Sequence, residues 1–82
     1  MIKVLFFAQL REQLGVDTLN VSYQENMSVA MLLDQLKTEN MHWQKILSSN
    51  TLMIAVNQNM STLSSLLQSG DEVAFFPPVT GG

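Results

Sequence analysis

One segment of the chain carries an apolar stripe at helical spacing that is long enough to cover a sheet. Val29, Leu32, Leu33 and Leu36 recur at intervals of three or four residues, and this period predicts an α-helix through about residue 39. Ser28 directly precedes the stripe and is a favourable N-cap residue. One helix of about three turns covers one face of a small sheet, which leaves the other face to solvent or to a partner.

The remaining apolar segments have the pattern of β-strands, namely residues 2–9, 18–23, 51–56 and 72–76. Alternation in the first strand puts one wholly apolar set on the core side, Ile2, Val4, Phe6 and Ala8. Phe7 then lies on the outer face. In the last strand Glu72 marks the outer face, which it shares with Ala74 and Phe76. We therefore expect Phe76 to be exposed.

Shorter signals connect these segments. Residues 10–14 predict a helical turn that Gly15 can end, and residues 42–48 predict a short helix or a turn. Asn57–Asn59 predicts a turn before a weak fourth strand, and residues 66–71 predict a turn into the last strand. The expected fold class is α+β, a mixed sheet of four to five strands with one main helix across one face. We expect the folded domain to occupy residues 1–76 and an extended, flexible C-terminal tail to occupy residues 77–82.

Composition narrows the possible functions. The net charge is −3 and the four Lys and Arg residues are widely spread, which argues against nucleic acid. Without cysteine and with His42 as the single histidine, beside Trp43 and expected at the surface or at a helix end, no metal site is predicted. Asp71-Glu72 follows Gly70 and is typical of a turn. With no signal peptide and no apolar run of about 20 residues, we expect a cytoplasmic protein without membrane contact.

The low charge also bears on the surface of the protein. Charged residues make up 13% of the chain, about half of the usual share of roughly 25%. Part of the exposed surface is therefore predicted to be apolar, and exposed apolar patches mark partner surfaces. The alternative is a neutral surface rich in Ser, Asn and Gln, which the chain also contains.

The last eight residues, FFPPVTGG, combine stiff and flexible residue types. Pro77 and Pro78 must end the preceding strand, because they donate no ladder hydrogen bond, and they favour an extended chain. Fully extended, the six residues after Phe76 reach roughly 20 Å beyond the fold. Gly81 and Gly82 lack a Cβ and suit a narrow channel, and the α-carboxylate of Gly82 is the one reactive group at the tip. The alternative is an ordinary flexible end.

Three stretches resemble the molybdopterin synthase small-subunit family (MoaD type), a ubiquitin-like group that also includes the ThiS carriers. They are GDEVAFFPPVTGG at 70–82, IKVLFFAQLRE at 2–12 and AVNQ at 55–58. The resemblance implies a β-grasp, ubiquitin-like fold and a sulfur carrier for molybdenum cofactor biosynthesis. It implies adenylation of Gly82 by an E1-like enzyme that uses ATP, and then a thiocarboxylate that donates sulfur to cyclic pyranopterin monophosphate. Because the chain has no cysteine, carried sulfur has only the terminus to occupy.

The resemblance also implies partners and site residues. No cofactor is expected on the chain itself, and a large subunit would supply the catalytic residues within a heterotetramer. Gly82 would be the thiolated residue, and the channel segment would be Gly81, Thr80, Val79, Pro78 and Pro77. The docking patch would contain Phe7, Met60 and Phe76, for which ordinary core packing is the alternative. Arg11 would contact the activating enzyme or the large subunit, or it is a solvated helix charge.

Three other functions remain open from the sequence. A sulfur carrier of the thiamine type and a ubiquitin-like modifier joined to lysines would share the Gly-Gly chemistry. The Pro-Pro and Phe-Phe pairs favour the molybdopterin type over both. A non-catalytic β-grasp interaction module, whose terminus does nothing, is the third.

Overall fold

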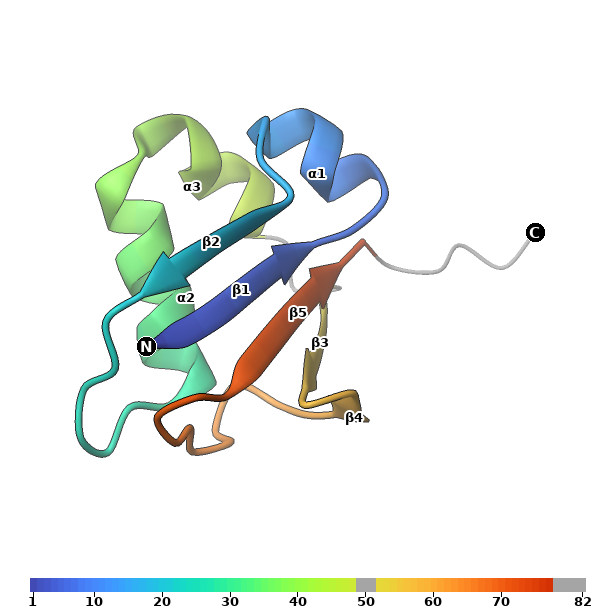
Figure 1. Cartoon of the computed structure of the whole chain (residues 1–82). Helices are drawn as coiled ribbons and strands as arrows, with labels where there is room; N and C mark the ends of the chain where they lie inside the picture. Colours follow the sequence, from blue (N-terminus) through green and yellow to red (C-terminus); the bar gives the residue numbers. More distant parts are fainter. Residues whose placement is uncertain (49–51, 78–82) are drawn as a thin grey trace.

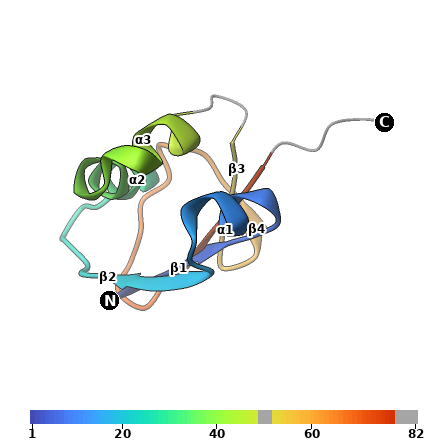
Figure 2. The same ribbon diagram turned by 90° about the horizontal axis from the view of Figure 1, so that it is seen from above.

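The computed structural model describes residues 1–48 and 52–77, which form one sheet with helices packed on one side of it (Figures 1 and 2). The elements in chain order are β1 (Ile2–Phe6), α1 (Gln9–Leu14), β2 (Thr18–Val21), α2 (Val29–Glu39), α3 (Met41–Leu47), β3 (Met53–Val56), β4 (Asn59–Met60) and β5 (Glu72–Phe76). Within the described residues the strand order is β2-β1-β5-β3-β4. β1 and β5 are parallel neighbours at the centre, and the other pairs are antiparallel. The predicted mixed α+β sheet is confirmed.

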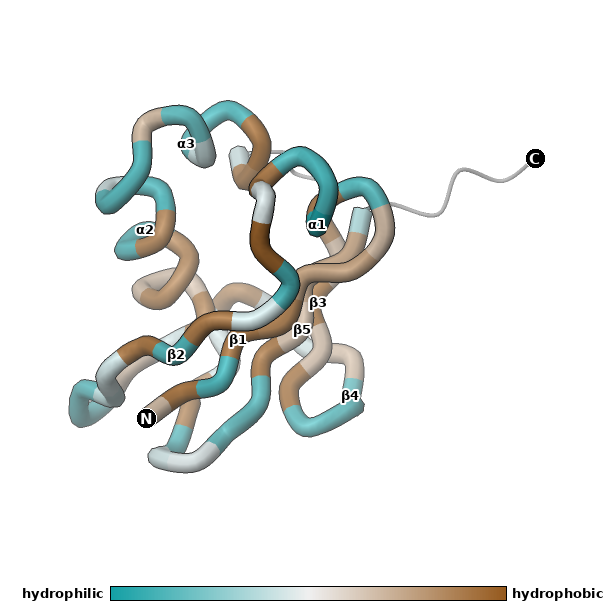
Figure 3. The backbone as a smooth tube through the Cα atoms, turned by 45° about the horizontal axis from the view of Figure 1, so that its top comes forward, coloured by the Kyte–Doolittle hydropathy of each residue, from teal (hydrophilic) through white to brown (hydrophobic). Residues whose placement is uncertain are grey.

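The main helix, α2, begins where the sequence predicts. The Ser28 hydroxyl oxygen accepts a hydrogen bond from the Met31 N–H at 3.2 Å, as an N-cap side chain does. The predicted leucine stripe is buried, and its four members are Val29, Leu32, Leu33 and Leu36. In Figure 3 the tube of α2 alternates between hydrophobic and hydrophilic colours, whereas the central strands are mostly hydrophobic. One side of α2 therefore faces the sheet and the other faces solvent.

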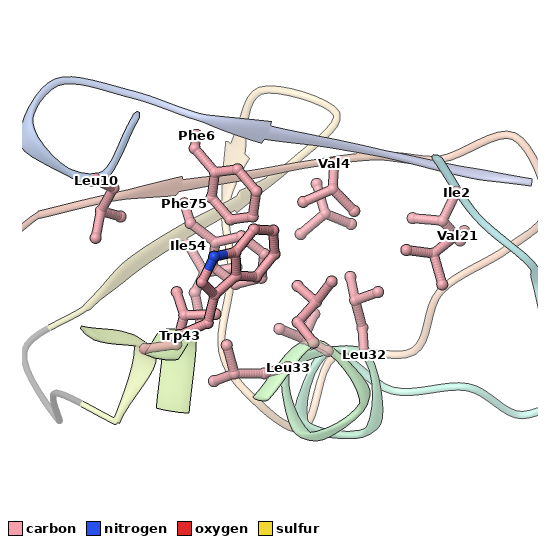
Figure 4. Close-up of a cluster of buried hydrophobic side chains, with 14 of the residues drawn as sticks. Ile2, Val4, Phe6, Leu10, Val21, Leu32, Leu33, Trp43, Ile54 and Phe75 are labelled. Carbon is pink, nitrogen blue, oxygen red and sulfur yellow. The ribbon is translucent and has the colours of Figure 1, made fainter. Parts of the chain in front are cut away.

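The core lies between the sheet and the helices (Figure 4). Within it the Phe6 ring contacts two other aromatic rings, the Trp43 ring at 5.7 Å in an edge-to-face arrangement and the stacked Phe75 ring at 5.9 Å. α1 contributes Leu10 and Leu14 to the same core, and α3 contributes Trp43 and Leu47. All three helices thus cover one face of the sheet.

Some predicted boundaries are wrong. β1 ends at Phe6 rather than residue 9, and Ala8 is exposed rather than in the core, because its positive φ of 55° turns the chain out of the strand. The turn after β3 consists of Asn57 and Gln58 alone, since Asn59 already pairs with Val56 in β4. β3 begins at Met53, and residue 51, where the sequence predicted its start, lies outside the described residues.

Other short elements are confirmed. α1 ends at Gly15, which has φ 80° and donates its N–H to the Arg11 carbonyl oxygen at 3.0 Å. α3 is a helix rather than a turn, and His42 is exposed in its first turn. Asp71 has the predicted turn role, since one of its carboxylate oxygens accepts a hydrogen bond from the Gln68 N–H at 2.8 Å.

Candidate functional site

The face of the sheet opposite the helices carries a band of apolar side chains. The register of the central strands places Leu5 opposite Ala74, and Ala74 opposite Ala55. These three positions alternate with the core residues of their strands, so they point away from the helices. Ala55 and Ala74 are buried although they lie outside the core cluster. Neighbouring side chains on the same face therefore cover them.

Those covering side chains include the three predicted docking residues. The Phe7 and Phe76 rings pack against each other in a tilted arrangement with centroids 5.5 Å apart. Met60 comes from β4, where it pairs with Ala55. All three line one shallow hollow together with Leu5, Ala55, Gln58, Glu72 and Ala74. We call Phe7, Met60 and Phe76, with the floor of Leu5, Ala55 and Ala74, the outer-face patch.

Exposure differs among the members of the outer-face patch. The side chains of Phe7 and Met60 are 45% and 62% exposed. Phe76 lies on the predicted face but is half-buried, which corrects the expectation that it is exposed. The Phe7 ring packs against the Phe76 ring and covers part of it, and this contact explains why Phe76 is less exposed than expected. The patch therefore consists of two prominent side chains around a partly covered ring.

Main-chain bonds fix the two aromatic members. Phe7 lies one residue beyond β1, yet its N–H donates to the Phe75 carbonyl oxygen at 3.2 Å and continues the contact between the central strands. Phe76 is held from the other side, where it pairs with Met53 of β3. The two rings thus extend from adjacent, hydrogen-bonded chain segments at one end of the sheet.

Three hydrogen bonds of Asn57, which we call the polar bracket, hold the hairpin that carries Met60. The Asn57 amide donates to the Asp71 carboxylate at 2.9 Å, and its side-chain oxygen accepts from the Glu72 N–H at 3.0 Å. The Asn57 N–H also donates to the Glu72 carbonyl oxygen at 2.8 Å. With φ 49°, Asn57 takes a left-handed conformation that asparagine tolerates better than most residues. This residue ties the β3–β4 turn to the start of β5.

The sequence does not reveal the polar bracket, and it does not identify the patch floor as part of a docking surface. The sequence predicts Asn57 only as part of a turn and of the AVNQ stretch, and its hydrogen-bond partners lie far away along the chain. Ala55 belongs to a continuously apolar strand, whose pattern does not show which side chains point outward. Strand alternation does put Leu5 and Ala74 on the outer face, and their place beside Phe7 and Phe76 is the signal that marks them as patch residues.

Arg11 is not part of the outer-face patch. It is an exposed residue of α1 and lines a different hollow with Glu12, Gly15, Val16 and Asp17. The contacts of the described residues do not favour either predicted role of Arg11, which is a contact with a partner or a solvated helix charge.

The patch lies directly before the C-terminal segment. Pro77 follows Phe76 and is half-buried. The other predicted tail residues lie outside the described residues, namely Pro78, Val79, Thr80, Gly81 and Gly82. Among residues 1–48 and 52–77, no three or more His, Cys, Asp or Glu side chains are grouped as a metal site requires. No helix in this part of the chain is long and apolar enough to cross a membrane.

The chain is similar to known proteins over all or nearly all of its length. Residues 4–82 match the ThiS family. The molybdopterin synthase sulfur carrier subunits of Escherichia coli K12 and Haemophilus influenzae are 45% and 40% identical to the chain, each over 82 residues and over the full length of both proteins. The family resemblance predicted from the three stretches is confirmed.

Solved structures share the fold. The small archaeal modifier protein 1 of Haloferax volcanii is 25% identical with a TM-score of 0.84, over 95% of this chain and 97% of that one. The complex of subunits 1 and 2 of the molybdopterin-converting factor of Helicobacter pylori contains a chain with a TM-score of 0.67. That chain is 23% identical, and the match covers 99% of this chain and 97% of that one. The predicted β-grasp fold is confirmed.

Proposed function

The chain belongs to the ThiS family, and on this premise we propose that it is the sulfur carrier subunit of a molybdopterin synthase. The observation that carries the proposal is the full-length similarity to two proteins of that name, at 40% and 45% identity. The outer-face patch adds physical support, because an apolar surface beside the C-terminal segment suits a protein that is held by its partners while its end is used.

The proposed chemistry takes place on the Gly82 carboxylate. A carboxylate is a poor electrophile, so an E1-like enzyme first transfers AMP to it from ATP and releases pyrophosphate. A sulfur nucleophile then attacks the acyl-adenylate, and AMP leaves. The product is a thiocarboxylate, which is a better nucleophile than a carboxylate at neutral pH, as a thiolate is relative to an oxyanion. ATP is thus a substrate of the activating enzyme and not a cofactor of this chain. Because activation consumes ATP, we propose that the carrier acts in the cytoplasm.

The sulfur acceptor is proposed to be cyclic pyranopterin monophosphate. In each transfer the thiocarboxylate sulfur attacks an acceptor carbon and a carbon–oxygen bond of the acceptor breaks, the oxygen leaving as water or as the opened phosphate ester. Water then hydrolyses the resulting thioester, which leaves the sulfur on the acceptor and returns the Gly82 carboxylate. Two such transfers supply the two sulfur atoms of the molybdopterin dithiolene. The chain is a co-substrate in this scheme, and the large subunit provides the catalytic residues.

The proposed partner of the outer-face patch is that large subunit, within a heterotetramer. The Helicobacter pylori neighbour is a complex of subunits 1 and 2 of a molybdopterin-converting factor, which supports a large-subunit partner for this chain. The exposed Phe7 and Met60 side chains have the apolar, adaptable character of interface residues. Docking at the outer-face patch would place the beginning of the terminal segment, Pro77 to Gly82, at the partner's surface.

A second candidate is a ubiquitin-like modifier. The similarity to an archaeal modifier protein favours it, because the two folds agree closely. A modifier and a sulfur carrier share activation of the terminal glycine and differ in the acceptor. A modifier forms an isopeptide bond with a lysine, whereas the carrier transfers sulfur to a small molecule.

The decisive experiment measures intact mass after the native-ended chain is incubated with ATP, a sulfur source and the cognate E1-like enzyme. We expect an increase equal to replacement of one oxygen by sulfur, located at Gly82 by fragmentation. The thiolated chain is then mixed with the large subunit and cyclic pyranopterin monophosphate, where the extra mass should disappear as molybdopterin forms.

A chain with one residue added after Gly82 is the matched control. It should keep the fold and the docking and lose the sulfur, because its terminal carboxylate is displaced. Activation of the native chain followed by attachment to lysines, without molybdopterin, would favour the modifier. A native chain that gains no sulfur from an enzyme active on another carrier would contradict the carrier, and a chain that is not adenylated at all would contradict both.

A further inference from the structure

Ala8 has a backbone conformation that alanine rarely adopts. Its φ is 55° and its ψ is −131°, a region that is occupied almost only by glycine because a Cβ is crowded there. The residue is exposed, so no side-chain burial compensates for this strain. Residues held in such conformations cluster at sites where a ligand or partner is bound.

The neighbours of Ala8 show why the chain turns at this position. Phe7 lies on the outer face with its N–H bonded to the Phe75 carbonyl oxygen, and Leu10 is buried in the core on the opposite side of the sheet. The Leu10 N–H donates to the Phe7 carbonyl oxygen at 3.2 Å, which closes a tight turn around Ala8 and Gln9. A positive φ at the first central position is the signature of a type II′ turn, where glycine is favoured. The chain thus passes from one face to the other within three residues.

We propose that Ala8 is a positioning residue that fixes the Phe7 side chain for partner docking, at the expense of fold stability. The proposal rests on the proposed function, because it takes the outer-face patch as the docking surface. The closed turn holds Ala8 at positive φ, where its methyl group leaves a narrower range of φ and ψ than glycine would have. That range fixes the direction of the chain directly after Phe7, whose ring packs on Phe76 at 5.5 Å. Glycine would relieve the strain but would let the same segment sample many more conformations.

Strain and restriction can be separated with a residue of opposite chirality. A D-amino acid favours positive φ for the same steric reason that an L-amino acid favours negative φ. D-alanine in place of Ala8 therefore keeps the methyl group and the restriction and removes the strain. Ala8→Gly removes both the strain and the restriction. The chain has 82 residues, a length that chemical synthesis by ligation reaches, and Gly82 is kept as the last residue.

The experiment measures melting temperature and affinity for the large subunit in three chains. We expect Ala8→Gly to raise Tm by about 4 °C and D-alanine to raise it further, by about 8 °C. Affinity should follow a different order. D-alanine should bind as the natural chain does, and Ala8→Gly should bind about two- to fivefold more weakly, because freezing a glycine backbone costs more entropy. Ala30→Gly, at an exposed position of α2, is the matched control and should leave affinity unchanged.

A crossed result, with stability increased and affinity decreased by Ala8→Gly, supports the proposal. Equal affinity of Ala8→Gly and the natural chain would overturn the positioning role, and a lower Tm for Ala8→Gly or for D-alanine would overturn the strain. Proton NMR of the free chains tests the restriction without any partner. Contacts between the Phe7 and Phe76 rings should weaken in Ala8→Gly and persist with D-alanine, and equal contacts in all three chains would also refute it. If the natural chain does not bind the large subunit, the proposed function fails, while the NMR comparison still decides the role of Ala8.

Discussion

Two phenylalanine pairs lie side by side in the sheet, one residue apart on each strand, and they face opposite ways. Phe6 and Phe75 are paired across the parallel central strands, and their stacked rings are 2% and 0% exposed in the core. Phe7 and Phe76, the next residues along, pack together on the outer face, where Phe7 is 45% exposed. The residue types are the same, and their successive positions along two neighbouring chain segments separate the two environments. Identical chemistry therefore holds the fold together on one face and presents a surface on the other.

The largest effect is expected from Phe75→Ala. It removes a fully buried ring that stacks on Phe6, and such truncations cost about 3–5 kcal/mol. In a domain of this size Tm should fall by at least about 12 °C, or the chain should not fold at all. Thermal unfolding followed by circular dichroism measures this. A fall of only one or two degrees would show that the inner pair contributes no more to stability than the outer pair.

Phe76→Ala should lower stability only slightly and weaken binding to the large subunit strongly. Because the ring is half-buried on the outer face, Tm should fall by a few degrees. A docking aromatic contributes about 2 kcal/mol or more to binding, so the dissociation constant for the large subunit should rise roughly thirtyfold. Calorimetry on the pair of proteins measures this. Unchanged affinity together with a collapse in stability would assign Phe76 to the core and remove the contrast between the two pairs.

Asn57→Ala tests how much the polar bracket beside the outer-face patch contributes to stability. The substitution removes both side-chain hydrogen bonds, to the Asp71 carboxylate and to the Glu72 N–H, and it leaves alanine at a φ of 49°. A loss of about 1–2 kcal/mol in the free energy of unfolding is expected. Asn57→Gly, which relieves the backbone strain and still lacks the side chain, is the matched control in urea denaturation. If that control is as stable as the natural chain, the bracket contributes nothing.

Met60→Ala should have a smaller effect that is confined to docking. The side chain is 62% exposed, so its loss should barely change Tm. Affinity for the large subunit should fall by about 1 kcal/mol, roughly fivefold, as for a contact beside the central aromatic. Leu66→Ala, the matched control, removes a similarly exposed side chain, at 69%, that does not line the hollow of the patch. Equal losses from the two substitutions would mean that the patch has no special place in docking.

Arg11→Ala should have the smallest effect. The residue is exposed and lies outside the patch, and surface substitutions of this kind change stability by no more than about 0.5 kcal/mol. Binding to the large subunit and to the activating enzyme should be measured separately. A tenfold loss toward either protein would extend the docking surface from the outer face onto α1.

Alternation and capping predict much of this fold from sequence. They place Phe7 and Phe76 on the outer face, Val73 and Phe75 in the core, and the start of α2 after Ser28. They give the direction of a side chain because it depends only on neighbours along the strand. The predicted functions of Gly82 and its tail rest on the family resemblance and are not tested by the described residues.

The remaining features arise from contacts between distant parts of the chain. Phe76 is half-buried because Phe7 packs on it, and this follows from pairing between the first and last strands. Asn57 acts through Asp71 and Glu72, which no local pattern connects to it. Ala8 breaks the strand pattern because the closing of the turn onto the core overrides its own backbone preference. Patterns among neighbouring residues in the sequence therefore do not predict these three features.

The central place of β5 has a mechanical consequence. The C-terminal segment continues from β5, which lies between β1 on one side and β3 on the other. A pull on that segment along the strand loads the hydrogen bonds to both neighbours in shear, so that they resist together and do not open one after another. An edge strand such as β4, which has one neighbour among the strands that the structure describes, would peel away under a much smaller transverse force. When the tail is pulled out of a tight partner, the force therefore acts on a strand that is hydrogen-bonded on both sides, and this strand resists the pull better than an edge strand would.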